Sequence, residues 1–210
     1  MRVEEDVVVA EGEVKKDKRP AEKTDWKQSV VLYMHDLIYM LVTIMIVFLL
    51  VFRVIVVSGS SMYNTLIDGD YLLLLSNVFY TEPKAGDIIV ISKESFDNGT
   101  PIIKRVIATE GQTVDIDFIA GVVYVDGKAL DEPYTYTPTN VDEGMKFPLT
   151  VEENCVFAMG DNRNNSHDSR SRDIGQVDHR EILGKALFLF LPGTDRGHSG
   201  PEYDRIGVVK

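Results

Sequence analysis

The sequence predicts a mainly β fold with coiled, barrel-like antiparallel sheets, preceded by one N-terminal transmembrane helix. Two observations carry this prediction. One long apolar run ends near residue 57, and after it come many short apolar or alternating runs separated by Gly, Asn and Asp turns. Frequent short strands are typical of sandwiches and barrels. At 210 residues, the chain has room for one domain of ordinary size plus appendages.

The first segment, residues 1–29, mixes charges of both signs and has little apolar periodicity. Such a composition cannot bury enough apolar surface to offset the entropy of ordering. We therefore expect a disordered cytoplasmic tail without catalytic residues.

The next segment, residues 30–57, is predicted to be a transmembrane anchor helix. Leu37 to Phe52 is uncharged and almost wholly apolar, and Val54 to Val57 extends the run past Arg53. As a helix, Leu37 to Val57 would span roughly 31 Å, about the thickness of the hydrocarbon core of a bilayer. A buried core helix should show a polar face, and this run has none. A cleaved signal peptide has a shorter apolar core, of about 7–15 residues.

The charges beside this run predict its orientation. After Arg53, no Lys or Arg occurs before Lys84. Basic residues are concentrated before the run instead: Lys15, Lys16, Lys18, Arg19, Lys23 and Lys27. Cytoplasmic flanks carry the excess of positive charge. We expect a single-pass protein of the cell membrane, with a cytoplasmic N-terminus and an extracytoplasmic domain.

Residues 58–193 are predicted to form this β-rich catalytic domain. Asp126-Gly127 between two apolar runs is its clearest hairpin signal. The expected strands are 71–75, 87–92, 102–108, 113–118, 122–125, 155–159 and 185–191. Residues 131–150 contain three prolines and indicate an irregular excursion. Residues 194–210 are Gly-rich and polar, and we expect a loosely held C-terminal tail.

Composition excludes several functional classes. The net charge is −11 and the pI near 4.8, which argues against a nucleic-acid partner because phosphate binding needs clustered Lys and Arg. Cys155 is the only cysteine, so neither an intramolecular disulfide nor a Cys-rich zinc site can form.

Two segments contain candidate catalytic residues. Ser61 lies in a hydroxyl-rich turn directly after the apolar run. Lys104 shares one face of its predicted strand with Ile102 and Val106, because side chains alternate along a strand. Desolvation lowers the pKa of a lysine and makes it a usable base near neutral pH. The alternative is a lysine at the strand edge whose amine reaches solvent.

A third segment, residues 160–170, follows an apolar strand and is dense in polar side chains. By itself it could be a surface loop stabilised by hydrogen bonds of Asn and Asp side chains to their own backbone.

Together the three segments resemble bacterial type I signal peptidases (leader peptidases), serine proteases with a Ser-Lys dyad. The matching segments are residues 59–66, 104–107 and 160–170, in the same order as in that family. Supporting matches are residues 86–90, 125–127 and 184–186. The resemblance covers the anchor and nearly all of residues 54–191, and a single N-terminal anchor makes it highly specific.

The resemblance implies a role for each matching residue. Ser61 would be the nucleophile, Lys104 the general base that takes its proton, and Ser166 the residue that orients the lysine amine. A serine hydroxyl needs such a base because it is a weak nucleophile. The backbone N–H of Ser61 would be one oxyanion donor. No metal or organic cofactor is called for.

Two structural ion pairs are also implied by the resemblance. Asp161 would pair with Arg105, and Asp168 with Arg170.

The sequence departs from the family pattern in three places. Asn64 replaces the usual proline, which should cost some rigidity of the turn. Gly59 replaces a hydroxyl residue that serves some members as second oxyanion donor, so that Ser58 or Ser60 would have to compensate. Extra residues 171–174 follow the last motif and offer Ser171-Arg172 as an alternative match to Ser169-Arg170.

The expected function is that of a membrane-anchored serine endopeptidase that removes signal peptides from exported preproteins. Its partners would be the lipid bilayer and signal peptides with small residues before the cut. A histidine base is a rival chemistry, but His167 and Asp168 are sequence neighbours whose side chains point apart in extended chain. A second alternative is a catalytically inactive, membrane-anchored β-domain that serves as a binding or scaffold protein. The sequence leaves the oligomeric state open.

Overall fold

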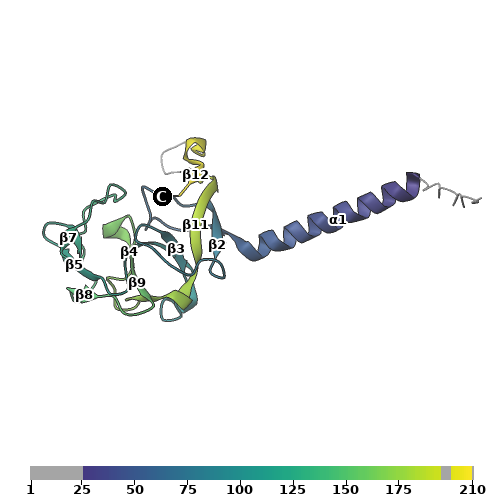
Figure 1. Ribbon diagram of the computed structural model, residues 1–210. Coiled ribbons are helices and arrows are strands. Elements are labelled where there is room, and N and C mark those ends of the chain that lie inside the picture. Colours follow the sequence, from purple (N-terminus) through teal and green to yellow (C-terminus); the bar gives the residue numbers. More distant parts are fainter. Residues whose placement is uncertain (1–25, 195–199, 210) are drawn as a thin grey trace, which may run out of the picture. The chain divides into compact units, whose positions relative to one another are not determined.

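The computed structural model describes residues 26–194 and 200–209, and most of its elements are strands (Figure 1). The mainly β prediction is therefore confirmed. Most of the predicted cytoplasmic tail lies outside the described residues. The chain divides into two units, one ending at Ile44 and one beginning at Met45.

The apolar run forms helix α1 (Trp26–Val51), and none of its side chains is buried. At 1.5 Å per residue, its 26 residues extend over about 39 Å. By length and composition, α1 can cross a membrane. An apolar helix without buried residues is consistent with a membrane anchor.

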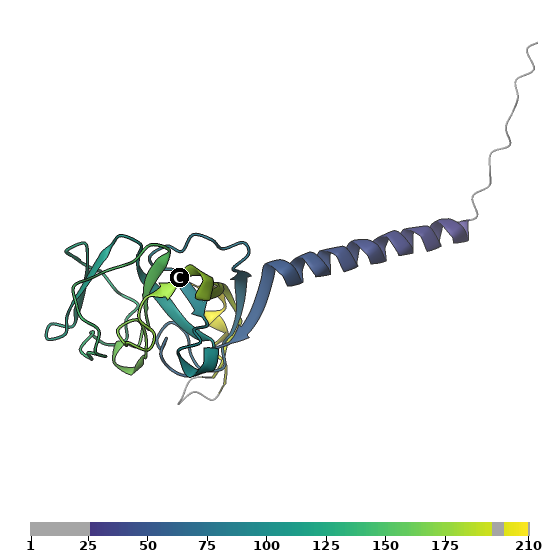
Figure 2. The ribbon, with the colours of Figure 1, turned by 90° about the horizontal axis from the view of Figure 1, so that it is seen from below.

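The helix ends at Val51 and not at Val57 as predicted. Strand β1 (Phe52–Val56) follows without a loop (Figure 2) and pairs antiparallel with β2 (Tyr71–Ser76). Three successive β-branched residues in β1 favour the extended conformation, and pairing with β2 satisfies their backbone groups. Hydropathy alone did not distinguish this strand from one more turn of helix.

Seven strands form the path of the larger antiparallel sheet, in the order β1-β2-β11-β3-β4-β9-β10, and β12 (Gly207–Val208) pairs with β11. The strands not yet defined are β3 (Ile88–Ile91), β4 (Ile102–Thr109), β9 (Cys155–Met159), β10 (Val177–Asp178) and β11 (Ile182–Leu191). All seven strands predicted from the sequence are present, with slightly different bounds.

A smaller antiparallel sheet has the order β7-β6-β5-β8. Its strands are β5 (Thr113–Asp117), β6 (Val122–Val125), β7 (Lys128–Ala129) and β8 (Leu149–Thr150). The predicted hairpin at Asp126-Gly127 is confirmed, because Val125 pairs with Lys128. Short 3-10 turns complete the described elements: η1 (Asp97–Gly99), η2 (Arg163–Asn165), η3 (His179–Glu181) and η4 (Tyr203–Arg205).

The larger sheet curls. Three strands separate β1 from β4, which would place them roughly 19 Å apart in a flat sheet. Yet residues 55–58 and 101–104 line one small cavity of about 70 Å³. Register shifts in β4 and β11 mark bulges, and bulges bend and twist a strand. The curl brings the end of β1 to the start of β4.

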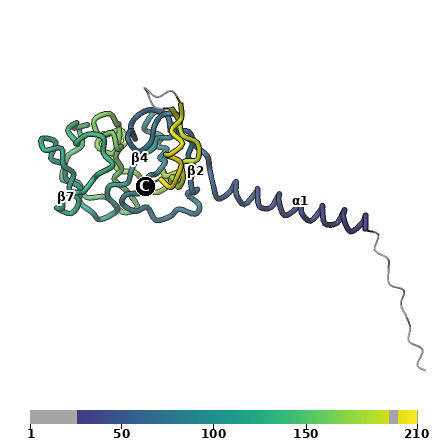
Figure 3. The backbone as a smooth tube through the Cα atoms, turned by 90° about the horizontal axis from the view of Figure 1, so that it is seen from above, coloured from purple at the N-terminus to yellow at the C-terminus, as the bar shows by residue number. Residues whose placement is uncertain are grey.

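The expectation of a loosely held C-terminal tail is wrong for the described residues 200–209. Strand β12 pairs with β11, and Arg205 forms a salt bridge with the fully buried Asp70. Figures 1 and 3 show this segment, in yellow, against the larger sheet beside β11 and β2. The sequence did not predict this docking because the segment is held by an ion pair and a short strand pairing, and neither leaves an apolar pattern in the sequence.

Candidate active site

Ser61 lies in the loop that joins β1 to β2. The loop is closed at its base by two backbone hydrogen bonds, from Val57 N to Asp70 O (2.8 Å) and from Gly69 N to Val57 O (2.9 Å). Met62 and Leu66, one helical turn apart, are buried in the core of the sheet. These apolar anchors fix the turn and leave Ser61 partly exposed.

The side chain of Lys104 points from β4 toward Ser61 and is almost completely buried from solvent. Its side chain lies on the sheet face shared with Ile89 and Val106, and the residue is 3% exposed. Its Nζ donates to Ser61 Oγ at 2.9 Å and to the carbonyl of Ile103 at 3.0 Å. The alternative of a lysine that reaches solvent is therefore wrong.

Burial lowers the pKa of Lys104 to about 8, because desolvation disfavours the ammonium form. The carboxylates of Asp168 and Glu143 oppose this shift by attracting the positive charge. A substantial fraction of Lys104 is thus neutral near physiological pH. A neutral amine can take a proton from the Ser61 hydroxyl across the same 2.9 Å.

Ser166 does not make the hydrogen bond that the resemblance implies. Its hydroxyl donates to Asp168 Oδ2 at 2.8 Å, and no hydrogen bond in the described part of the chain joins it to Lys104. For the Ser166 hydroxyl proton, a buried carboxylate is a stronger acceptor than a lysine amine. Ser166 nevertheless lies close to the Ser61 backbone: a Cβ on Gly160 would be 2.2 Å from Ser166 Oγ and 2.5 Å from Ser61 O. Only glycine fits between them.

Residues 160–170 are more than a surface loop, because they hold the serine turn. Asn162 donates from its backbone N to Ser61 O (2.9 Å) and from its side chain to Ser60 O (3.0 Å). Asn165 donates to the Ser60 hydroxyl at 2.9 Å. The backbone on both sides of the Ser60–Ser61 peptide bond is therefore tied to this loop.

A buried ion pair joins the serine turn to the lysine strand. Arg105, the residue after Lys104, donates two hydrogen bonds to Asp161 at 2.8 and 2.7 Å, and both side chains are nearly inaccessible. The Thr65 hydroxyl of the serine turn also donates to Asp161. The implied pair Asp161–Arg105 is confirmed, and it connects three segments that are distant in sequence.

The second implied pair, Asp168–Arg170, is also confirmed, with Arg170 Nε 2.8 Å from Asp168 Oδ1 and both side chains fully buried. Although burial raises the pKa of Asp168, the hydrogen bonds and charge of Arg170 lower it below its usual value. Arg172, by contrast, is exposed and donates to the Gly144 carbonyl. Burial and partner therefore favour Arg170, and not Arg172, as the residue that matches the family motif.

The serine turn offers candidate donors for a developing oxyanion. Over residues 26–194 and 200–209, no acceptor takes the Ser61 N–H. Ser58 lines the cavity that Ser61 and Lys104 also line. Ser60 Oγ lies outside that lining and already accepts from Asn165. Of the two proposed substitutes for the residue at Gly59, Ser58 is the better placed.

The contacts of His167 do not include Ser61. His167 contacts Ser171 Oγ at 2.9 Å, Glu143 at 3.4 Å and the ring of Phe96. Ser171 is only 2% exposed, so this Ser-His contact is closed to a peptide. Within the described ranges, no group of three or more His, Cys, Asp or Glu is arranged to hold a metal ion.

Sequence reasoning missed the support that the irregular residues 131–140 give to the site. Glu132 binds the buried Arg163 with both carboxylate oxygens, at 2.9 and 2.6 Å. The ring of Tyr134 lies 4.0 Å from the guanidinium carbon of Arg105. Aromatic residues among the prolines were the only local signal of such packing.

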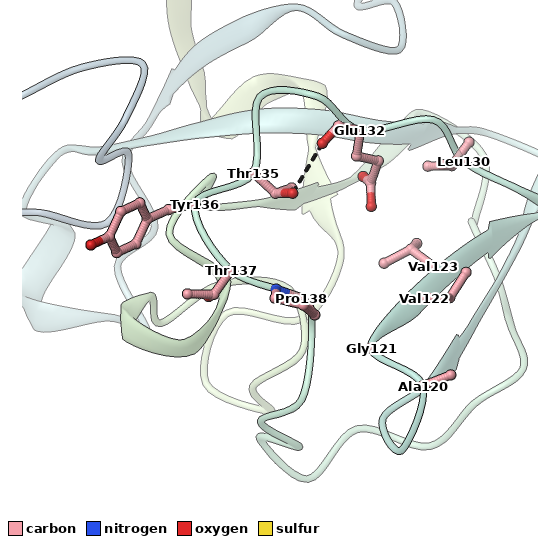
Figure 4. Close-up of a pocket in the computed structure, with 10 residues that line it drawn as sticks. All are labelled: Ala120, Gly121, Val122, Val123, Leu130, Glu132, Thr135, Tyr136, Thr137 and Pro138. Carbon is pink, nitrogen blue, oxygen red and sulfur yellow. Dashed lines mark hydrogen bonds between the residues drawn. The ribbon is translucent and has the colours of Figure 1, made fainter.

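The same residues border a second cavity, of about 290 Å³ (Figure 4). Val122, Val123 and Leu130 line one side of it and the loop from Glu132 to Pro138 the other, while the ring of Tyr136 points outward. No residue of the serine cavity lines this one.

Comparisons with known proteins identify the family. Residues 30–191 match the family described as signal peptidase, peptidase S26. A probable signal peptidase I-1 of Synechocystis sp. is 38% identical over 151 residues, which cover 69% of this chain and 74% of that protein. A signal peptidase I of Bacillus licheniformis is 32% identical over 177 residues, which cover 80% and 92%. The crystal structure of a signal peptidase I of Enterococcus faecalis V583 is 30% identical, covers 50% of this chain and 97% of its own, and has a TM-score of 0.40.

The backbone conformation of Asn64 reverses the expectation that proline would suit this position better than asparagine. Its φ is +97°, a region that asparagine tolerates and proline, fixed near −65°, cannot adopt. We expect Asn64→Pro to lower the melting temperature by several degrees, because the turn must rearrange around it. Asn64→Gly is the matched control and should leave the melting temperature unchanged or raise it. A proline variant as stable as the parent would contradict this.

Proposed function

Because the chain belongs to the peptidase S26 family of signal peptidases, we propose that Ser61 and Lys104 form the dyad with which it removes signal peptides. The activity is that of signal peptidase I, a serine endopeptidase. The observation that carries the assignment is the 2.9 Å contact between Ser61 Oγ and the dry Lys104 amine. That contact combines a nucleophile and a base within the reach that proton transfer needs.

The chemistry proceeds in two halves. Neutral Lys104 takes the Ser61 proton as Oγ attacks the scissile carbonyl, and the Ser61 N–H with Ser58 stabilises the oxyanion. The resulting Lys104 ammonium then protonates the leaving amine, which is the new N-terminus of the mature protein. Water next hydrolyses the acyl-serine, with Lys104 again taking the proton.

Ser166 makes no hydrogen bond to Lys104 in the structure, and we propose that it acts only once the ammonium has formed. Its one hydroxyl proton is given to Asp168, so toward Lys104 it can offer only lone pairs. An acceptor favours the ammonium that forms during the first step over the neutral amine. We propose that the Lys104 ammonium turns toward a lone pair of Ser166, which would stabilise the charge that the base acquires, while Asp168 and Arg170 hold Ser166 in place.

The signal peptide binds in the cavity between β1 and β4. β1 is an edge strand of the sheet, so its outer backbone groups are free to pair with an extended peptide. The cavity is small, with a volume of about 70 Å³. Its apolar lining residues are Ile55, Val56, Val57, Met62, Ile102 and Ile103. Only small side chains before the cut fit such a site.

The enzyme acts at the outer face of the cytoplasmic membrane. The basic residues before α1 assign its N-terminus to the cytoplasm, and residues from Ser58 onward to the outside. Ten positions separate Val51, where the helix ends, from Ser61, a reach of at most about 35 Å. A preprotein whose own signal helix lies in the same bilayer presents its cleavage site at that depth.

Substitution of the dyad tests the assignment directly. Ser61→Ala and Lys104→Met should each lower kcat/KM by at least about a thousandfold, since a dyad acts as a unit, while melting temperature and secondary structure persist. Lys93→Met, which removes a partly buried, ion-paired lysine that does not line the cavity beside Ser61, is the control and should retain activity. An active Ser61→Ala enzyme would contradict the assignment. If neither the parent nor the variants cleave the substrate, the result favours the catalytically inactive scaffold.

The pKa of Lys104 predicts the pH profile. Below about 8 the amine is protonated, so kcat/KM should rise about tenfold per pH unit and level off above that pH. Glu143→Gln removes a carboxylate that raises the pKa of Lys104 and should move the rising limb toward lower pH. Steady-state kinetics on a synthetic signal-peptide substrate measures both. A profile flat from pH 6 to 9 contradicts a lysine base.

Strand addition predicts which substrate amides matter. Proline placed in turn at each of the four positions before the cut should lower kcat/KM at the positions whose N–H pairs with β1, because proline lacks that donor. Alanine at the same positions is the control for side-chain size. Unimpaired cleavage of every proline substrate would rule out this binding mode.

A further inference from the structure

The carboxylate of Asp70 is a buried junction at the base of the serine turn. It is fully inaccessible. Arg205 binds both of its oxygens, at 2.9 and 2.7 Å. The backbone N–H groups of Ile67 (2.9 Å) and Gly193 (2.8 Å) also donate to it. Asp70 therefore joins the turn to the C-terminal segment.

Arg205 also touches the serine turn directly. Its Nη2 donates to the carbonyl of Thr65 at 3.2 Å. The hydroxyl of the same Thr65 donates to Asp161, the partner of Arg105. Thr65, four residues after Ser61, is thus bound to two carboxylate–guanidinium pairs, through its carbonyl to one and through its hydroxyl to the other.

After β11, the chain at Gly193 packs closely against residues 68–70 at the base of the serine turn. A Cβ on Gly193 would lie 2.3 Å from Asp68 O and 2.8 Å from the carbonyl carbon of Gly69. Beyond Gly193, the pairing of β12 with β11 holds residues 207–208 against the sheet, and Arg205 lies just before that strand. The signal peptidase match ends at residue 191, so the motifs that define the site assign no role to this segment.

The serine turn depends on such support. Gly59 has φ +89° and nothing within 4 Å of its missing side chain, and Ser58, Gly59 and Ser60 are exposed. The first half of the turn is therefore held by hydrogen bonds, from the Gly59 N–H to Asp68 and from Asn162 and Asn165 to Ser60, and not by packing of its own side chains. Displacement of a reacting atom by about 1 Å can cost roughly a hundredfold in rate.

We propose that Arg205 is a positioning residue for catalysis: through Asp70 and Thr65, the C-terminal segment holds the Ser61 turn in register with Lys104. The inference rests on the proposed role of Ser61 as nucleophile. It assigns Arg205 no contact with substrate and no effect on the pKa of Lys104. Loss of Arg205 should therefore misplace the nucleophile and leave both substrate binding and the base intact.

The test compares Arg205→Met and Arg205→Lys in the full-length, detergent-solubilised enzyme with a synthetic signal-peptide substrate. We expect Arg205→Met to lower kcat about tenfold to a hundredfold, with KM within twofold and the rising limb of the pH profile unmoved. Arg205→Lys should recover part of kcat, because one ammonium can reach Asp70 but cannot reproduce the planar fork. Hydrogen exchange should quicken in residues 57–70 and stay unchanged in 102–109.

Arg180→Met is the matched control. Arg180 also binds an aspartate, Asp178, with two side-chain nitrogens, but its side chain is 90% exposed. It should keep full activity. The inference is overturned if Arg205→Met retains kcat within twofold, or if exchange quickens throughout the domain and the melting temperature collapses in both Arg205 variants, which would make the residue merely structural.

The parent enzyme and Ser61→Ala are measured in the same assay. Absence of cleavage by the parent, or cleavage by Ser61→Ala, would contradict the proposed function. The exchange of residues 57–70 would still decide whether Arg205 holds the turn.

Discussion

The buried ion pair between Arg105 and Asp161 is the interaction on which the rest of the site depends. Arg105 follows Lys104 directly, so the pair fixes the strand that carries the base. Asp161 also accepts from Thr65 and precedes Asn162, which binds the Ser61 carbonyl. Removal of either partner would leave a buried charge unpaired, at a cost of roughly 3–5 kcal/mol. One contact therefore sets the spacing of three segments.

Opposing effects set the basicity of the Lys104 amine, the proposed base. Burial alone would lower its pKa further, but Asp168 and Glu143 restore part of the attraction for a proton. Both carboxylates are themselves bound to Arg170, which limits their effect. The balance leaves a pKa of about 8, at which an amine can both accept and release a proton near neutral pH.

The anchor and the site are close in the chain, and this follows from the way the helix ends. β1 begins at the residue after α1, and the loop that contains Ser61 begins where β1 ends. β1 is also an edge strand and lines the cavity beside Ser61. One short segment therefore connects the anchor to the proposed nucleophile and contains the backbone groups that we propose pair with a peptide.

By itself, the sequence determined the features that local pattern controls. Alternation placed Lys104 among aliphatic side chains, Asp126-Gly127 specified a hairpin, and motif order gave the family and both ion pairs. Only the tertiary structure decided where α1 ends, which partner Ser166 chooses, why Asn64 suits its turn, and that Arg205 reaches Asp70. Each of these depends on pairing or burial between segments distant in the chain. A local pattern shows which conformation a residue prefers. The residue that pairs with its backbone, its charge or its hydroxyl comes from a distant segment, which only the fold brings close.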